Sequence, residues 1–321
     1  MVILYSRIAD RLWPRERYPM FRLRIYRIVG ILLNFFFVLR FSIWKLYSKI
    51  RFGINRWIQL DYGRLCVRSD DYRAYWIART GGTQKETIST WINLNSLKPE
   101  LCVDVGANYG EFTLAAVGFG IPSIAIEANP SIVNCLKNSF IDYHSITVVH
   151  AAVSDTNGYL SFYFNPQYTG GASLSKKMPK IKVFFGQRDT IHSIEVRSIR
   201  LDSLVLNEFR MKPKSIILKI DVETFEINVL NGALPLLAQC DWWRAIIEFN
   251  VDAIRDTNGN VEEIWKTYRS FHGHVIGQQA ISEEKSRTLT NDLPESPPSS
   301  SCDILIGHGV VKTITNPKSD T

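Results

Sequence analysis

"LCVDVGANYGEF", residues 101–112, is the stretch that decides the fold of this chain. Mostly apolar residues lead into a glycine-rich turn, and a helical pattern begins at Glu111. A buried strand that ends in such a turn opens a nucleotide-binding α/β unit. The turn reads Gly106-x-Asn108-x-Gly110, which is one residue shorter than a dinucleotide loop and has asparagine in place of the middle glycine. A pyrophosphate is therefore poorly accommodated.

The shorter turn suits S-adenosylmethionine, a methyl donor that has no phosphate. Its methionine end would lie over the turn. Glu127, twenty-one residues after Gly106 at the end of the second strand, would accept hydrogen bonds from both ribose hydroxyls. Asp104 would hold the loop or meet the donor's ammonium group through a water molecule. The predicted donor site consists of Asp104, Gly106, Asn108, Gly110, Glu127 and Ala152.

Beyond the turn, the sequence alternates between strand and helix. Unbroken apolar runs, typical of strands buried on both faces of a parallel sheet, lie at 101–105, 123–126, 146–153, 215–222 and 243–249. Helical patterns follow at 111–117, 131–140, 223–238 and 261–271. Between the third and fourth strands, an alternating pair with Gly170-Gly171 as its mobile loop predicts a β-hairpin insertion. A Pro/Ser-rich loop at 291–301 precedes one more strand, in "CDILIGHG".

Positive charge is concentrated at the N-terminus. Residues 1–60 hold twelve Lys and Arg against two acids, whereas the other 261 residues carry a net charge of −3. The body of the protein thus has no electrostatic preference for a polyanion, and we expect no nucleic-acid partner. Five widely spaced cysteines indicate a reduced, cytoplasmic protein with unpaired thiols.

The apolar run at 28–41 is shorter than the roughly 20 residues that a spanning helix needs. No small-residue cleavage site follows it, so a secreted protein is not expected. On a helix, Arg27, Asn34, Lys45, Lys49 and Arg56 fall along one stripe, which predicts amphipathic helices with basic flanks. These helices either lie on an anionic membrane surface, at the inner face of the membrane, or pack on the catalytic body.

Several blocks resemble, in order and spacing, the FkbM-type methyltransferases, which are S-adenosylmethionine-dependent O-methyltransferases. They include "LCVDVGANYGEFTL", "SIAIEANPSIVNCLKNSF", "TGGASL", "SIILKIDVETFEINVLNGALPLL" and "AIIEFN". The resemblance implies a Rossmann-like seven-stranded α/β sheet whose last strand, at 302–307, is antiparallel. It also implies an acceptor hydroxyl on a sugar, glycolipid or polyketide. The family usually reads K-I-D-V-E-G-x-E, whereas this chain has Thr224-Phe225 after Glu223.

Methyl transfer to a hydroxyl needs alignment and a group that accepts the proton. Asp221 is the first candidate, because the carboxyl end of a central strand faces the ligand crevice of an open α/β sheet. Glu223, the second catalytic candidate, and Glu248 end the same and the neighbouring strand. The three carboxylates would either raise one another's pKa or bind a divalent cation. Glu226 falls in the first turn of a helix, where an acid stabilises the helix dipole without any catalytic role.

The sequence therefore predicts an O-methyltransferase with three segments. These are a basic amphipathic helical extension at 1–80, a methyltransferase domain at 81–310 and a tail at 311–321. Two alternatives remain at this point. An NAD-dependent oxidoreductase shares the glycine turn and the later acid, and a membrane-attached binding protein with a decayed site would account for Thr224-Phe225.

Overall fold

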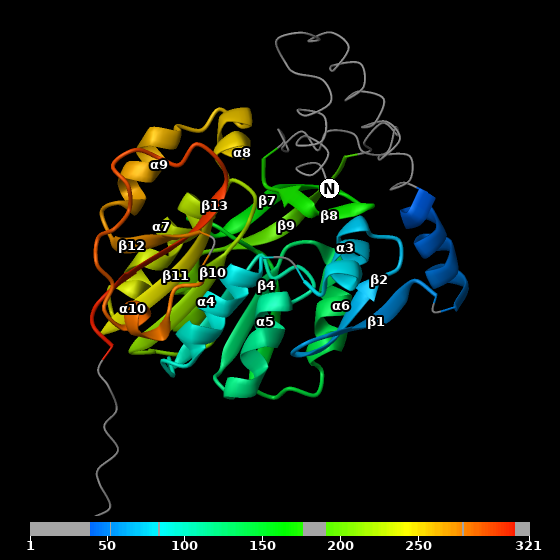
Figure 1. Cartoon of the computed structure of the whole chain (residues 1–321), viewed down its shortest axis with the longest axis horizontal. Helices are drawn as coiled ribbons and strands as arrows, with labels where there is room; N and C mark the ends of the chain where they lie inside the picture. Colours follow the sequence, from blue (N-terminus) through cyan, green and yellow to red (C-terminus); the bar gives the residue numbers. More distant parts are fainter. Residues whose placement is uncertain (1–38, 52, 83, 176–190, 278, 312–321) are drawn as a thin grey trace, which may run out of the picture.

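A computed structural model describes residues 39–311 of the chain, except residues 52, 83, 176–190 and 278. A seven-stranded sheet forms the centre of this part (Figure 1). Its strands, in order across the sheet, are β12 (His272–Ile276), β13 (Cys302–His308), β11 (Trp242–Phe249), β10 (Ser215–Ile220), β3 (Leu101–Val105), β4 (Ser123–Glu127) and β5 (Ile146–His150). β13 is antiparallel to both of its neighbours, and the pairs from β11 to β5 are parallel. The predicted Rossmann-like sheet with an antiparallel last strand is confirmed.

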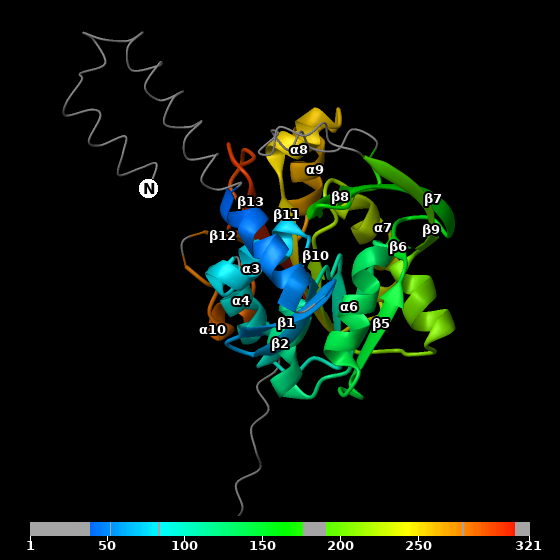
Figure 2. The same ribbon diagram turned by 90° about the vertical axis from the view of Figure 1, so that its right-hand side faces the viewer.

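Helices cover both faces of this sheet, as Figures 1 and 2 show. One face packs against α7 (Glu226–Leu237), α8 (Val251–Asp256), α9 (Val261–Tyr268) and the helical turn η2 (Ser203–Glu208). The other packs against α4 (Lys85–Asn95), α5 (Glu111–Ala116) and α6 (Pro130–Phe140). The turn η1 (Val117–Phe119) follows α5, and α10 (Glu283–Arg287) precedes β13. All six residues of β10 are buried, because side chains that point to either face meet a helical layer.

Three predicted elements differ from the structure. The run at 146–153 is divided, since the chain leaves the sheet after β5 and continues as β6 (Ala152–Val153) in a second, four-stranded sheet. Gly170 and Gly171 lie inside β8 (Tyr168–Ser173) and not in a loop, because the tight turn after β7 (Gly158–Asn165) falls at 166–167. The order of the second sheet is β6, β9 (His192–Ile199), β7 and β8.

The third difference is the start of α7, which begins at Glu226 and not at 223. Glu223 and Thr224 have φ angles of 55° and 83°, which a right-handed helix excludes. The chain therefore makes a turn after β10 before the helix can begin.

The segment assigned to a helical extension, 1–80, is only partly helical in its described part. Residues 39–51 are helical, but β1 (Asn55–Leu60) and β2 (Gly63–Arg68) form an antiparallel pair, followed by α3 (Tyr72–Thr80). Alternate apolar side chains of the pair, such as Ile58 and Val67, are buried against α6, so the pair packs on the body. Of the predicted basic stripe, Arg27 and Asn34 lie outside the described residues, and Arg56 lies in a strand.

Within the described part of the chain, no helix combines the length and apolar character that crossing a bilayer requires. All five cysteines are free thiols, four of them buried, as the sequence predicts. The predicted tail lies outside the described residues from position 312 onward.

Candidate functional site

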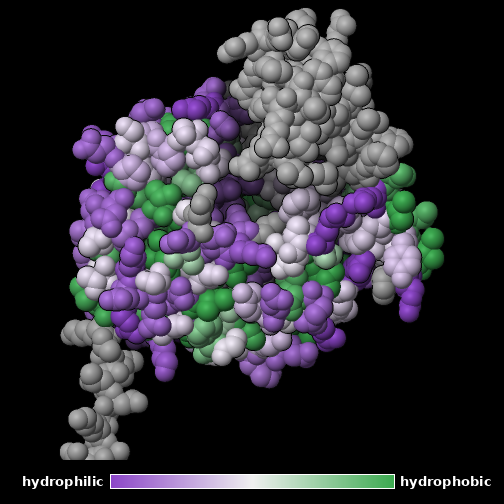
Figure 3. Space-filling view, in the orientation of Figure 1, coloured by the Kyte–Doolittle hydropathy of each residue, from purple (hydrophilic) through white to green (hydrophobic). Residues whose placement is uncertain are grey.

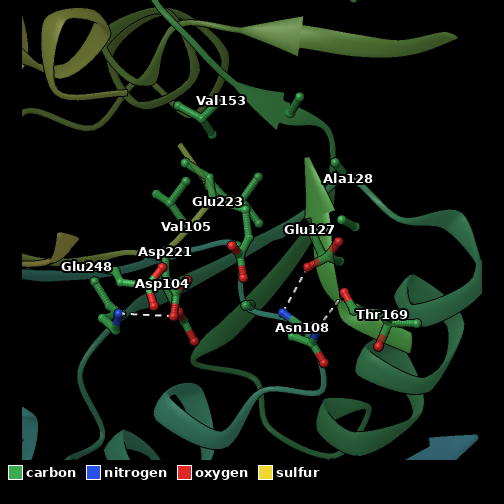
Figure 4. A pocket seen from close by; sticks show the side chains of 18 of the residues that line it. Asp104, Val105, Asn108, Glu127, Ala128, Val153, Thr169, Asp221, Glu223 and Glu248 are labelled. Atoms are coloured by element: carbon green, nitrogen blue, oxygen red, sulfur yellow. Dashed lines mark hydrogen bonds and ion pairs between the residues drawn. The ribbon is translucent and has the colours of Figure 1, made fainter. Parts of the chain in front are cut away.

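A pocket of about 310 Å³ opens at the carboxyl ends of β3, β4 and β10 (Figure 4). Ligands of open α/β sheets bind at this edge. The predicted residues that line it are Asp104, Gly106, Asn108, Glu127, Ala152, Asp221 and Glu223. Gly110 does not line the pocket, because it lies against α6, where a Cβ would be 2.6 Å from the Phe140 ring.

The glycine turn is shaped by two close approaches. Gly106 has a φ of 79°, and a Cβ there would lie 1.9 Å from the carbonyl oxygen of Asp221. Only glycine can occupy a left-handed position with backbone that close. Gly110, with a φ of 92°, precedes the first residue of α5. The two glycines therefore let the chain turn sharply from β3 into α5, and Gly106 presses the turn against the segment after β10.

Glu127 fixes the turn through its carboxylate. Asn108 N–H donates to Oε2 at 2.8 Å (Figure 4), and Asn129 N–H donates to Oε1 at 2.7 Å. The side chain is 6% exposed, and burial raises the pKa of Glu127 to about 7, although the backbone donors oppose this shift. The Glu127 carboxylate also lines the pocket, and each of its oxygens can accept a further hydrogen bond from a ligand.

Asp104 also holds the turn, at the end of β3. Its Oδ2 accepts hydrogen bonds from Thr113 N–H at 3.1 Å and from the Thr113 hydroxyl at 2.6 Å. Burial raises the pKa of Asp104 to about 6. Of the two roles predicted for this residue, the structure shows the first, that of holding the loop onto α5.

The wall next to Glu127 is apolar. Ala152 contributes from β6, together with Ala128, Val153 and Phe162. The two alanines leave room for a flat group beside the acid. The pocket thus runs from an apolar end near Glu127 to a polar end beside β10 and β11.

Three carboxylates converge at that polar end. Asp221, Glu223 and Glu248 each offer an oxygen, and these oxygens lie within 4.8 Å of one another. Figure 4 shows the three groups beside one another, after β10 and at the end of β11. Burial, and then the neighbouring negative charges, raise the pKa of Glu223 and Glu248 well above the usual range. Oxygen ligands at such spacing also suit a divalent cation.

Lys219 lies beneath this cluster. It is 1% exposed, and its Nζ donates to Asp221 Oδ2 at 3.2 Å and lies 3.7 Å from Asp303 Oδ1. Burial lowers its pKa, but the surrounding carboxylates outweigh that effect and raise it. The buried ammonium group therefore orients Asp221 and offsets part of the negative charge of the cluster.

The turn at 221–226 departs from the family pattern at Thr224. This β-branched residue has a φ of 83°, a conformation that glycine adopts without strain. Glu226 holds the turn, because its Oε1 accepts from Val222 N–H at 3.0 Å and from Thr224 N–H at 3.2 Å. Phe225, the other departure, directly precedes α7. Glu226 is thus a structural clamp.

Two residues of this region fall outside the sequence prediction. Asp71 is fully buried and accepts hydrogen bonds from the Tyr109 hydroxyl at 2.6 Å and from Thr169. Arg73, on α3, lines the pocket and forms an ion pair with Glu111. The only local signal for either residue is the helix start at Asp71, which caps α3. Neither residue is predicted from the sequence, because both lie in the segment 1–80, whose pattern predicts a separate extension.

Comparison with known proteins identifies the family. The model of the FkbM methyltransferase domain matches residues 104–276, more than half of the chain. No curated protein sequence matches the chain. This match favours the methyltransferase over the oxidoreductase that shares the glycine turn.

Solved structures with a similar backbone share little sequence with this chain. A SAM-dependent methyltransferase from Agrobacterium tumefaciens has 10% identity, covering 82% of this chain and 72% of that chain, with a TM-score of 0.39. A precorrin-6y C5,15-methyltransferase from Geobacter metallireducens has 11% identity, with coverage of 71% and 90% and a TM-score of 0.35. An rRNA methylase from Streptococcus thermophilus has 9% identity, with coverage of 72% and 99% and a TM-score of 0.36.

The assignment rests on the family model, which spans the glycine turn, Glu127 and the cluster that follows β10. The chain belongs to the FkbM family of S-adenosylmethionine-dependent methyltransferases.

Proposed function

We propose that the protein transfers the methyl group of S-adenosylmethionine to a hydroxyl of a sugar, glycolipid or related polyol. The observation that supports this most directly is the position of Asp221, Glu223 and Glu248. These carboxylates line the same pocket as the glycine turn and Glu127. A donor seated on the turn would therefore have proton acceptors beside it.

The pocket residues fit the donor. Glu127 can accept hydrogen bonds from ribose hydroxyls, and the apolar wall that includes Ala152 and Phe162 can contact the base. Arg73 and Lys219 are the two cationic side chains among the described residues that line the pocket. Lys219 is held beneath the cluster, so Arg73 is the cation that a carboxylate on the donor can reach. Bound S-adenosylmethionine supplies the electrophilic methyl group.

The chain's own residues then align the acceptor and accept its proton. Asp221, which Lys219 orients, would take the proton of a hydroxyl, and Glu223 and Glu248 would bind neighbouring hydroxyls. Proton acceptance by a positioned carboxylate is worth about 10²–10⁴ in rate. Holding the oxygen about 3 Å from the methyl carbon supplies much of the remaining acceleration.

The charge of the pocket favours an acceptor that is neutral at the reacting end. Among the described residues, two cationic side chains and six carboxyl groups line the pocket. The carboxyl groups are those of Asp104, Glu111, Glu127, Asp221, Glu223 and Glu248. A phosphate or nucleic-acid backbone next to this cluster would meet like charge. A polyol donates hydrogen bonds to carboxylates and suffers no such repulsion.

Two measurements test the proposal. Calorimetric titration with S-adenosylmethionine, S-adenosylhomocysteine and NAD should show binding of the first two ligands only. Radiolabelled methyl transfer into glycan and lipid fractions of the cell envelope should label a hydroxyl as an ether, stable to mild base. Binding of NAD alone would overturn the donor assignment. Label found only on nitrogen or in nucleic acid would overturn the acceptor class.

A further inference from the structure

The helix at 39–51 has one face fixed to the body of the protein. Phe41 is 5% exposed, and its ring centroid lies 5.7 Å from that of Tyr72 and 5.6 Å from that of Tyr75 on α3. Trp44 adds a ring contact with Tyr75 at 5.4 Å. Ser48, one turn further on, is fully buried and accepts a hydrogen bond from Arg56. This face is part of the protein's core.

The opposite face is apolar and open. At about 100° per residue, Leu39, Ile43, Leu46 and Ile50 fall within an arc of about 60°, on the side away from Phe41. Their exposed fractions are 43%, 58%, 62% and 78%. Hydrophobic side chains gather at the right-hand edge of Figure 3, over this helix. Four large apolar side chains exposed in one row form a patch, unlike single surface residues, and such patches mark interaction sites.

Basic residues flank the apolar row on both sides. At about 100° per residue, Arg40 and Lys49 lie about 60° outside the row, one on each side, and Arg51 and Lys45 lie further round on the same two sides. The helix contains no Asp or Glu between positions 39 and 51. An apolar face bordered by cations on both edges matches the headgroup region of an anionic bilayer, where each basic residue is attracted by the surface potential.

We infer that this helix docks in the plane of an anionic lipid bilayer, with Leu39, Ile43, Leu46 and Ile50 inserted among the lipids. A second copy of the chain fits the same face less well, because pairing two such helices would bring their basic edges together. Figure 2 shows the helix lying alongside α3 and β1, at the outside of the described part of the molecule.

Docking would also bring the pocket close to the lipid. α3 contacts the docking helix through Tyr72 and Tyr75, and its Arg73 lines the pocket. A single helix thus separates the lipid contact from the site. This geometry would favour acceptors that are presented at a membrane surface. The docking itself does not depend on methyl transfer.

Vesicle sedimentation of the full chain, without donor or acceptor, tests the inference. The protein should pellet with vesicles of phosphatidylcholine and phosphatidylglycerol, should not pellet with phosphatidylcholine alone, and should be released by high salt. Ile43→Ser/Leu46→Ser/Ile50→Ser should weaken partitioning at least tenfold. Lys45→Glu and Lys49→Glu should each weaken it about fivefold or more.

Matched controls exist elsewhere on the surface. Ile141→Ser removes a side chain that is 75% exposed at the end of α6, and Lys137→Glu reverses an exposed charge on α6, both outside residues 39–51. These variants should pellet like the wild type. Donor binding by each variant reports that it is folded, so a loss of docking is distinguishable from a failed methyltransferase. The inference is overturned if the triple serine variant pellets like the wild type. It is equally overturned if that variant changes only the oligomeric state in the absence of lipid.

Discussion

Two buried glutamates, Glu127 and Glu226, hold two turns at the same edge of the sheet. Each accepts hydrogen bonds from two backbone N–H groups. Their exposed fractions are 6% and 5%, and burial raises the pKa of each to about 7. Only Glu127 lines the pocket. The two glutamates thus stabilise their turns in the same way. Glu127 is available to a ligand and Glu226 is not, because only Glu127 lies at the cavity.

The backbones of the two turns differ. The first turn places glycines at two of its positive φ angles, whereas the second places Glu223 and Thr224 there. The first conformation is encoded locally, because glycine adopts it freely. The second is maintained by contacts such as the one from the Ser173 hydroxyl to the Glu223 carbonyl at 2.6 Å. A turn can therefore be specified either by its own residues or by its surroundings.

The contact between the two turns should give the largest effect. Gly106→Ala would place a Cβ 1.9 Å from the carbonyl oxygen of Asp221, so backbone must move in one of the turns. We expect a loss of about 4 kcal/mol or more in the free energy of unfolding, measured by denaturant titration. Gly118→Ala is the control, since nothing lies within 4 Å of its Cβ position. Equal effects of the two changes would show that the turns are not in firm contact.

The second turn carries the proposed proton acceptor. Asp221→Asn should lower turnover by about 10²–10⁴ and leave donor affinity near the wild-type value, because the carboxylate acts on the acceptor. Asp303→Asn changes another partner of Lys219 that does not line the pocket, and it should affect turnover far less. Single-turnover kinetics and donor titration measure the two quantities. Loss of donor binding in Asp221→Asn would place this residue in the donor site instead.

The same assay separates the two roles open to the cluster. Chelation with EDTA should leave the wild type active if Asp221 accepts the proton directly. Loss of activity that Mg²⁺ restores would show that Asp221, Glu223 and Glu248 hold a cation.

The first turn should respond in donor affinity. Glu127→Ala would remove the proposed charge-assisted contact with the ribose, so donor binding, measured by calorimetry, should weaken at least tenfold. Glu226→Gln, at a site of similar burial and pKa outside the pocket, should leave affinity nearly unchanged. Equal losses in the two variants would mean that Glu127 acts only through the turn.

The pH dependence of donor binding sharpens the same contrast. The free protein holds the pKa of Glu127 at about 7, above its ordinary value of 4.5, and hydroxyl donors favour the ionised form. Donor affinity should therefore rise as the pH increases through 7 and level off above it. Glu127→Gln should remove this rise, whereas Glu226→Gln should retain it. Titrations between pH 6 and 8, in buffers of matched ionic strength, would check both outcomes. This pH range is chosen because it brackets the Glu127 pKa of about 7.

The smallest effect concerns strain. The left-handed conformation of a β-branched residue costs about 1–2 kcal/mol, and Thr224→Gly removes this cost. The glycine also increases the conformational entropy of the unfolded chain, which offsets part of the gain. We expect a net gain of about 1 kcal/mol in the free energy of unfolding. Thr257→Gly, at a φ of −90°, should instead destabilise the protein. A loss of stability in Thr224→Gly would mean that the threonine side chain contributes contacts that outweigh its strain.

Much of the sheet and half of the site could be predicted from local pattern. The strand–glycine–helix unit at 101–112 and Glu127 could be predicted because only a short stretch of chain separates them. The convergence of Asp221 and Glu248 followed from the rule that parallel strands end at one edge. The break at Ala151 and the place of Gly170 within a strand could not be predicted, because the pairing of β6 with β9 and of β8 with β7 decides them.

By itself, the sequence determined the parallel sheet, the glycine turn and the family, since apolar runs and glycine spacing act through neighbouring residues. Only the tertiary structure brought Arg73 to the pocket, and Asp71 to its bonds with Tyr109 and Thr169, from more than 30 positions before the glycine turn. It also decided that Glu226 is a clamp while Glu127 faces the cavity. Burial and the approach of distant side chains depend on how layers pack, and no local pattern encodes that packing.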